Sequence, residues 1–223
     1  MTTKLFWDDP YQTECTATVT EINGKKIKLD QTIFFAFSGG QASDEGTIGG
    51  MTVIEAIKQG DKENIIDIEY TLQTEPRFKV AAVVTIKIDP ERRRKLRNLH
   101  SAAHLLYYLS PDFIGKVKII GSNIAPEKAR MDFLYEKPLN DLIPPLEAKM
   151  NAFIHQNHLI IMKNDDPKSD LRWWTCGEWK MPCGGTHVRS SGEIGPVRLK
   201  RVNIGKGKER IEIYLQQVDK VSP

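Results

Sequence analysis

The chain has 223 residues, of which 40% are apolar and 27% are charged, with a formal net charge of +3. This composition is typical of an ordinary soluble protein, and the small net charge does not by itself indicate a nucleic-acid-binding protein. Neither a signal peptide nor an apolar run long enough to span a membrane is recognisable. Three scattered cysteines argue against a disulfide framework, so we expect a reducing, cytoplasmic setting.

The first 88 residues are dominated by short strand patterns. Asn23-Gly24 separates two runs of alternating apolar and polar residues, which predicts a hairpin within residues 14–30. Further strands are expected at residues 32–37, 46–54, 64–70 and 79–88. Many short strands separated by turn residues predict a small N-terminal β-barrel domain over residues 1–88.

A glycine-containing loop, residues 37–46, interrupts these strands. It contains Gly39-Gly40-Gln41, and two interpretations of it stay open. It is either a flexible turn between strands, or a loop whose backbone comes close to a ligand or a neighbouring domain with Gln41 as a polar contact.

The second part, residues 89–223, is expected to open with a long helix. Asp89-Pro90 supplies an N-cap residue and a proline at the first helical position, and Ser110-Pro111 ends the helix near Leu109. Its first turns carry a basic cluster, which is either a solvated face or a set of phosphate contacts. The cluster consists of Arg92, Arg93, Arg94 and Arg97.

The remaining elements alternate between strands and one helix. A strand pair is predicted at residues 116–124 and 129–134, a helix at 140–157, and short strands at 159–162 and 171–175. A final hairpin, residues 195–203 and 209–216, turns around Gly205-Lys206-Gly207.

Two His/Cys pairs stand out as candidate metal ligands. His100 and His104 lie four residues apart in the predicted helix, so both rings point from one face. Cys183 and His187 frame a double glycine, which predicts a loop that lets both side chains reach one ion. Three imidazoles and one thiolate suit a single Zn²⁺ ion in a tetrahedral site. His155 and His158 are interpreted as surface or capping residues.

These motifs, taken in order, resemble a known family. The order His-x-x-x-His, Gly121-Ser122, Arg130-x-Asp-Phe and Cys-Gly-Gly-Thr-His resembles the editing domain of alanyl-tRNA synthetase. The segments around Gly39-Gly40-Gln41 and Asp44-Glu45-Gly46 resemble its N-terminal glycine-rich barrel, although Ser38 and Ala42 stand where the family usually has Gly and Pro. With no aminoacylation part attached, the chain resembles the freestanding AlaX type.

The resemblance implies both a fold and an activity. It implies an α+β protein: a small N-terminal β-barrel, followed by an α/β editing domain (89–223) in which helices pack on an antiparallel sheet. The implied activity is zinc-dependent hydrolysis of mischarged tRNA(Ala), chiefly seryl-tRNA(Ala), with glycyl-tRNA(Ala) left open. The implied partner is the acceptor end of tRNA(Ala), whereas the oligomeric state and the tRNA nucleotides contacted are not predicted.

Roles for further residues follow from the implied reaction and from the residue types. Zinc would polarise the ester carbonyl or activate a zinc-bound water for attack, with backbone N–H groups of Gly184 and Gly185 near the developing oxyanion. Candidate substrate-binding residues, with Ser122 preferred as the group that recognises serine, are Ser122, Gly121, Gln41, Gly39, Gly40, Thr186 and Ser101. Candidate tRNA contacts are Arg92, Arg93, Arg94, Arg97, Lys206, Lys208 and Arg210.

Three other functions remain open at this point. The same four ligands would also serve a structural-zinc module that binds tRNA without turnover. The editing domain of threonyl-tRNA synthetase shares the metal pattern, although the glycine-rich segment favours the alanine type. A zinc esterase acting on an unrelated small ester is the third alternative.

Overall fold

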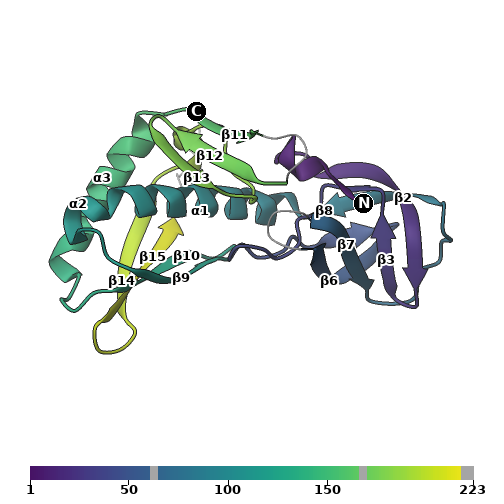
Figure 1. Ribbon diagram of the computed structural model, residues 1–223, viewed down its shortest axis with the longest axis horizontal. Coiled ribbons are helices and arrows are strands. Elements are labelled where there is room, and N and C mark those ends of the chain that lie inside the picture. The colour runs from purple at the N-terminus through teal and green to yellow at the C-terminus, as the bar shows by residue number, and fades with distance from the viewer. Residues whose placement is uncertain (61–64, 166–169, 217–223) are drawn as a thin grey trace, which may run out of the picture. The chain divides into compact units, whose positions relative to one another are not determined.

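The computed structural model describes residues 1–60, 65–165 and 170–216, and its fold is α+β, as predicted (Figure 1). The chain divides into two compact units. The first unit consists of Met1–Arg94, Met162–Trp174 and Met181–Thr186. The second unit consists of Lys95–Ile161, Thr175–Lys180 and His187–Pro223.

Six strands of the first unit pair in a closed ring in the order β2-β3-β7-β6-β5-β8. These strands are β2 (Glu14–Asn23), β3 (Lys26–Leu29), β5 (Gly46–Ile48), β6 (Met51–Gly60), β7 (Ile65–Leu72) and β8 (Val83–Ile88). β1 (Thr3–Lys4) pairs in parallel with β4 (Gln31–Thr32), and a short 3-10 helix, η1, spans Leu5–Trp7. The apolar side chains of the ring are buried in one core.

The hairpin predicted at Asn23-Gly24 is confirmed. Asn23 pairs with Lys26 across the turn, and Gly24 has a φ of 57°, a left-handed conformation that glycine adopts without strain. The expected strand at residues 46–54 is two strands, β5 and β6, joined at Gly49-Gly50. Asn64, where another strand was expected to begin, lies outside the described residues.

The strand expected at residues 32–37 is wrong beyond Thr32. Residues 33–36 are buried apolar side chains without ladder pairing, and side chains bind their backbone instead. Thr32 Oγ1 accepts from Phe34 N at 2.9 Å, and Asp44 Oδ2 accepts from Phe35 N at 2.7 Å. A continuous apolar run therefore marks core rather than strand here.

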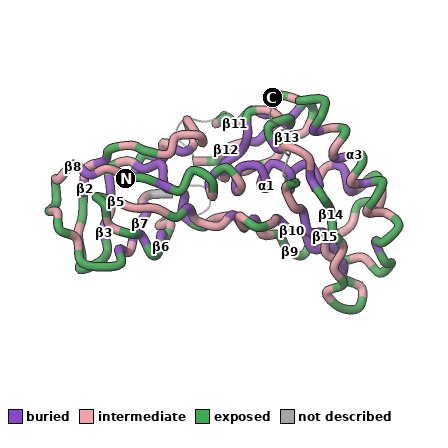
Figure 2. Tube along the Cα trace, turned by 180° about the vertical axis from the view of Figure 1, so that it is seen from behind, coloured by how far each residue is buried: buried purple, intermediate pink, exposed green. Residues whose placement is uncertain are grey.

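The predicted long helix is confirmed as α1 (Pro90–Leu109). Asp89 Oδ1 accepts hydrogen bonds from Glu91 N at 2.9 Å and Arg92 N at 3.0 Å, which caps the first turn. Ser110 precedes a second short helix, α2 (Pro111–Ile114). Figure 2 shows α1 buried along much of its length, and both predicted histidine ligands lie in this part.

The second unit contains a four-stranded antiparallel sheet in the order β14-β15-β10-β9. Its strands are β9 (Ile119–Ile124), β10 (Ala129–Leu134), β14 (Val197–Asn203) and β15 (Lys208–Leu215). Alternate residues such as Met131, Phe133 and Ile211 are buried on one face, whereas charged residues line the other. Figures 1 and 2 place α1 on one side of this sheet.

Helix α3 (Ile143–His155), preceded by η2 (Asn140–Leu142), covers the open edge of β14. Asn151 Oδ1 accepts from Val197 N at 2.8 Å, and Glu147 Oε2 accepts from Leu199 N at 2.7 Å. The helix therefore satisfies edge groups that would otherwise be available to another strand.

A third sheet has the order β11-β12-β13. Its strands are β11 (Ile160–Asn164), β12 (Arg172–Cys176) and β13 (Trp179–Pro182), the last of which was not predicted. The 3-10 helix η3 (Ser191–Ile194) precedes β14. Among the described residues, no helix is long and apolar enough to cross a membrane.

One ion pair is fully buried in the first unit. Arg93 Nε donates to Asp44 Oδ1 at 3.0 Å, Nη2 also bonds to Asp44, and further guanidinium bonds reach the carbonyls of Ile33 and Pro10. Both side chains are 0% exposed. Such a pair is tolerated because every charge has several partners, and breaking it leaves a charge buried alone.

Arg93→Ala is expected to lower the free energy of unfolding by about 3–5 kcal/mol, because the Asp44 carboxylate would stay buried without its partner. The matched control is Arg94→Ala, which removes an exposed arginine that pairs with Glu91 and should cost no more than about 1 kcal/mol. Urea unfolding of both variants measures the difference. Equal losses in the two variants would contradict a special role for the buried pair.

Candidate metal centre

Three buried imidazoles meet in the second unit. His100 and His104 lie one turn apart on α1, with ring centroids 4.9 Å apart. The His187 ring centroid lies 4.1 Å from that of His100 and 4.5 Å from that of His104. All three residues are at most 7% exposed. Protonating all three imidazoles would place three positive charges close together in a buried site, so the neutral form of the rings is favoured.

Cys183, four residues before His187, completes a cluster of four donors. One ligand atom from each of the four residues lies within 4.8 Å of all the others. Three ring nitrogens and one sulfur, partly or fully buried, form a set that could hold a metal ion. His155 and His158 are not part of this cluster; His158 Nε2 instead bonds to Gln156 Oε1 at 2.8 Å.

Burial controls the protonation of the donors. It lowers the pKa of His100 to about 3, and burial together with the neighbouring imidazoles lowers the pKa of His104 and of His187 well below the ordinary value. Each ring therefore keeps a lone pair at neutral pH. Burial raises the pKa of the Cys183 thiol to about 12, which opposes the thiolate that a metal requires. A divalent cation at the donor atoms would reverse this preference.

Ser101 lies behind one of the rings. Its Oγ is 3.1 Å from His187 Nδ1 and accepts a hydrogen bond from Val188 N at 3.2 Å. Ligation through His187 Nε2 would leave the proton on Nδ1, from which it can be donated to Ser101. Ser101 was predicted to bind substrate. In the structure it is 0% exposed and lies where it can orient the ring of His187, a candidate metal ligand.

The segment that carries Cys183 belongs to the first unit and is bonded to other parts of it. The side chain of Gln41 forms two hydrogen bonds with Thr186: its Oε1 accepts from Thr186 N and its Nε2 donates to Thr186 Oγ1, each at 3.0 Å. Trp7 Nε1 donates to Gly184 O at 2.9 Å, and Gly185 N donates to Cys183 Sγ at 3.4 Å. In the last bond the Gly185 N–H, predicted as an oxyanion donor, is directed at the sulfur of Cys183.

The glycine loop that carries Gln41 is a tight turn. Ser38 and Gln41 exchange backbone hydrogen bonds, and Gly39 and Gly40 have φ values of 59° and 88°. The two glycines therefore form the turn. The side chain of Gln41, which follows them, is 0% exposed and bonds to Thr186 instead of facing solvent.

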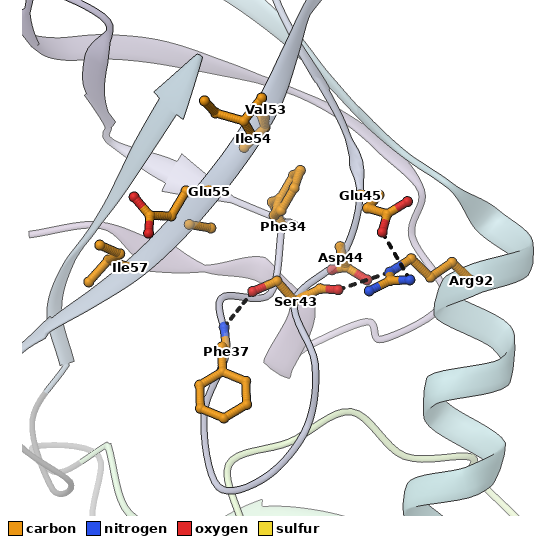
Figure 3. A pocket seen from close by; sticks show the side chains of 11 residues that line it. Phe34, Phe37, Ser43, Asp44, Glu45, Val53, Ile54, Glu55, Ile57 and Arg92 are labelled. Atoms are coloured by element: carbon orange, nitrogen blue, oxygen red, sulfur yellow. Dashed lines mark hydrogen bonds and ion pairs between the residues drawn. The ribbon is translucent and has the colours of Figure 1, made fainter. Parts of the chain in front are cut away.

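Figure 3 shows how helix α1 holds this loop beside a cavity of about 410 Å³. Arg92 Nε donates to Ser43 O at 3.0 Å, and its guanidinium pairs with Glu45, also at 3.0 Å. Ser43 Oγ in turn accepts from Phe37 N at 2.8 Å. Arg92 and Arg93, predicted as tRNA contacts, are thus committed to the loop, and buried Arg93 is not available to a phosphate.

The other predicted residues lie on or near the surface, apart from Arg97. Ser122 is exposed on β9, opposite Met131, and neighbouring Gly121 is opposite Asp132. Arg94 is exposed and pairs with Glu91, while Arg97 is only 8% exposed. Lys206 and Lys208 are exposed, and Arg210 is half-buried.

Two residues at the loops were not predicted. Trp7 supports Gly184, and Asp44 links the glycine loop to Arg93. Asp44 was part of a quoted motif, but its charge alone did not indicate a buried partner. Trp7 carries no sequence signal for its contact, which joins residues 177 positions apart.

Comparison with known proteins decides the family. The chain is 34% identical to the alanyl-tRNA editing protein AlaX-M of Pyrococcus horikoshii over 220 residues, which cover 97% of this chain and 99% of that protein. The chain belongs to the AlaX family of alanyl-tRNA editing proteins. Residues 171–212, which include Cys183 and His187, also match the family described as the threonyl and alanyl tRNA synthetase second additional domain.

Larger relatives contain a similar region. The chain is 30% identical over 210 residues to the alanine–tRNA ligase of Campylobacter jejuni, covering 86% of this chain and 24% of the ligase. It is 33% identical over 218 residues to that of Neorickettsia sennetsu, covering 87% of this chain and 26% of the ligase. The chain thus corresponds to about a quarter of each ligase.

Purified protein is expected to hold about one metal ion per chain, because one set of four donors converges among the residues that the structure describes. His104→Ala and Cys183→Ala should each lose the ion, since three donors remain. Cys176→Ala is the matched control, because Cys176 is a buried thiol outside the cluster. Elemental analysis after dialysis measures the content. Loss of metal from Cys176→Ala would show that the wrong thiol has been assigned.

Proposed function

We propose that this chain is a zinc-dependent aminoacyl-tRNA deacylase that hydrolyses the ester bond of mischarged tRNA(Ala). The observation that carries the proposal is the buried cluster of three imidazoles and one thiol in a member of the AlaX family. The chief substrate in this proposal is seryl-tRNA(Ala), with glycyl-tRNA(Ala) as the second substrate to test. The reaction is assigned to the cytoplasm, where charged tRNA is used.

Zinc is the proposed ion because its preferred ligands are imidazole nitrogen and thiolate sulfur in a tetrahedron. His100, His104, Cys183 and His187 would hold it. When bound, Zn²⁺ polarises a carbonyl or lowers the pKa of a bound water to about 7. The leaving group is a ribose hydroxyl of the terminal adenosine, so the chain needs no strong general acid.

The protein's own contribution is to fix the donors in advance. Ser101 would hold the ring of His187 through Nδ1, and the Gly185 N–H would stabilise charge on the Cys183 sulfur. Gln41 fixes Thr186, the residue before a ligand, by two hydrogen bonds. The N–H of Gly184 is the remaining backbone candidate for the oxyanion. Donors held this way lose little freedom when the substrate arrives.

The two parts of the chain have separate proposed tasks. We assign the six-stranded ring to a small β-barrel domain over residues 1–88, and the catalytic editing domain to residues 89–223. Gly39 and Gly40 serve the barrel loop by forming its turn, and the loop serves the site through Gln41. The acceptor end of the tRNA, with the ester bond to be cleaved, would bind to the editing domain.

Discrimination between serine and alanine is assigned to Ser122. The two amino acids differ by one hydroxyl, and a site rejects a ligand that lacks the hydroxyl when a polar group would be left unpaired. Ser122 is exposed at an edge strand and can reach a ligand, whereas the hydroxyls of Ser101 and Thr186 are buried and already bonded. Gly121 beside it stays a candidate substrate contact through its backbone, since a Cβ there would meet Asp132 Oδ2 at 3.1 Å.

A structural-zinc module that binds tRNA is the second candidate. The observation in its favour is that the cluster offers four protein donors, which would fill a tetrahedral zinc shell without an open position. Such a protein would bind tRNA(Ala) without turnover. A deacylation assay therefore separates the two functions.

Wild-type protein is expected to release serine from seryl-tRNA(Ala) and to leave alanyl-tRNA(Ala) intact. Dialysis against a chelator should abolish the activity and added Zn²⁺ should restore it, because the ion supplies the electrophile. Release of radiolabelled serine measures the rate. Tight binding of tRNA(Ala) by zinc-loaded protein without any serine release would instead identify the structural module.

Ser122→Ala is expected to slow seryl-tRNA(Ala) hydrolysis by an amount equivalent to one hydrogen bond, about 1–3 kcal/mol in kcat/KM. Ser122→Thr keeps the hydroxyl and should retain most of the rate, and zinc content should stay unchanged in both. Comparison of seryl and glycyl substrates shows whether the loss is specific for serine. Normal discrimination in Ser122→Ala beside lost discrimination in Gln41→Ala would move the selector to the glycine loop.

A further inference from the structure

The outer face of the four-stranded sheet in the second unit is strongly cationic. Cross-strand pairs place residues of β14, β15 and β10 on one face, for example Arg130, Glu212 and Lys200 in one row. The opposite face is the buried apolar one. We call this surface the cationic face; its basic residues are Lys128, Arg130, Arg198, Lys200, Lys208 and Arg210.

Two carboxylates organise the centre of this face. Asp132 accepts from Arg210 Nε at 2.7 Å and also bonds to Arg130, and Glu212 bonds to Lys128 and to Tyr214 Oη. Burial alone would raise the pKa of both carboxyls, but these hydrogen bonds hold the pKa of each below its ordinary value. Both acids are therefore ionised at neutral pH and fix the positions of the cations around them.

The face has more positive charge than the chain as a whole. Six basic side chains and two carboxylates give it a net charge of +4, against +3 for the full sequence. The other residues of the protein therefore carry a slight net negative charge. Cations concentrated on one face attract a polyanion more strongly than the same charges spread over the molecule.

Part of this charge is available to a partner. Arg198, Lys200 and Lys208 are exposed, and none of them forms an ion pair with the residues that the structure describes. The guanidinium of Arg198 lies 5.7 Å from the ring centroid of Tyr214, and Lys128 Nζ lies 5.9 Å from it. The ring thus holds cations at the surface without neutralising them.

We propose that the cationic face binds the phosphate backbone of double-stranded RNA. This inference rests on the proposed function, and the double-stranded RNA it assigns to the cationic face is the acceptor stem of the tRNA substrate. Guanidinium and ammonium groups on neighbouring strands match an array of phosphates, and contacts to a phosphate backbone need no reading of base edges. The arginines at the start of α1 suit this task less, because Arg92 and Arg93 are bound to the glycine loop.

The test measures binding of an unacylated hairpin RNA with the acceptor-stem sequence of tRNA(Ala) between about 50 and 200 mM salt. Arg198→Ala, Lys200→Ala and Lys208→Ala are combined in one variant. Loss of three phosphate contacts should weaken binding about 10- to 100-fold at low salt and reduce the slope of log K against log salt by about 2–3.

Two further variants serve as controls. Lys25→Ala, Lys79→Ala and Lys87→Ala, combined, remove the same charge from exposed lysines of the first unit and should leave the slope unchanged. Arg198→Lys, Lys200→Arg and Lys208→Arg, combined, keep the charge and should bind about as wild type. Thermal unfolding of each variant checks that the sheet is intact.

The outcomes separate this inference from the proposed function. An unchanged affinity and slope in the face variant overturn the inference, even when wild type hydrolyses seryl-tRNA(Ala). A loss confined to the face variant supports it, even when no hydrolysis is found. Equal losses in the face variant and the first-unit control would show attraction by overall charge and would also overturn it. Heparin and duplex RNA can also be compared as competitors for the bound hairpin. If both weaken hairpin binding equally, the face has no preference for duplex RNA, which overturns the inference and points to an acidic partner of another class.

Discussion

A guanidinium and a carboxylate are costly to bury unless they meet each other and find further hydrogen bonds. Arg93 and Asp44 satisfy this condition in the first unit, with the carbonyls of Ile33 and Pro10 as additional acceptors. Arg93 lies in α1 seven residues before His100. Asp44 lies in the same glycine-containing loop as Gln41, whose side chain bonds to Thr186, the residue before His187. The ion pair thus joins the helix that carries two of the histidines to the loop that bonds to Thr186.

Local chemistry explains which features could be predicted. The Asn23-Gly24 hairpin, the Asp89 cap of α1 and the i,i+4 spacing of His100 and His104 depend on neighbours in sequence, and the structure has each of them. Cys183 and His187 lie four residues apart, so the proximity of these two donors was predictable as well. Their meeting with His100 and His104 was predicted from the donor set that zinc prefers, not from local geometry.

Tertiary contacts explain what could not be predicted. The bonds of Gln41 to Thr186 and of Trp7 to Gly184 join residues 145 and 177 positions apart, and nothing in the local pattern selects these partners. Arg92, Arg93 and Arg94 looked alike in sequence, yet Arg93 is buried, Arg92 bonds to the glycine loop and Arg94 pairs on the surface. The sequence showed that these arginines gather at one end of the helix. Their separate partners depend on the loop that packs beside that end, which the sequence did not show.

The long separation of Gln41 and Thr186 has a consequence for the order of assembly during synthesis. The six-stranded ring is complete at residue 88, so it can form early on a nascent chain. Thr186 and the adjoining His187 and Cys183 leave the ribosome much later. Until then the amide of Gln41 has no Thr186 to bind, and the two histidines of α1 lack half of their donor set. The site is therefore among the last parts of the protein to assemble, and a translation product that stops before Cys183 would lack two of the four donors.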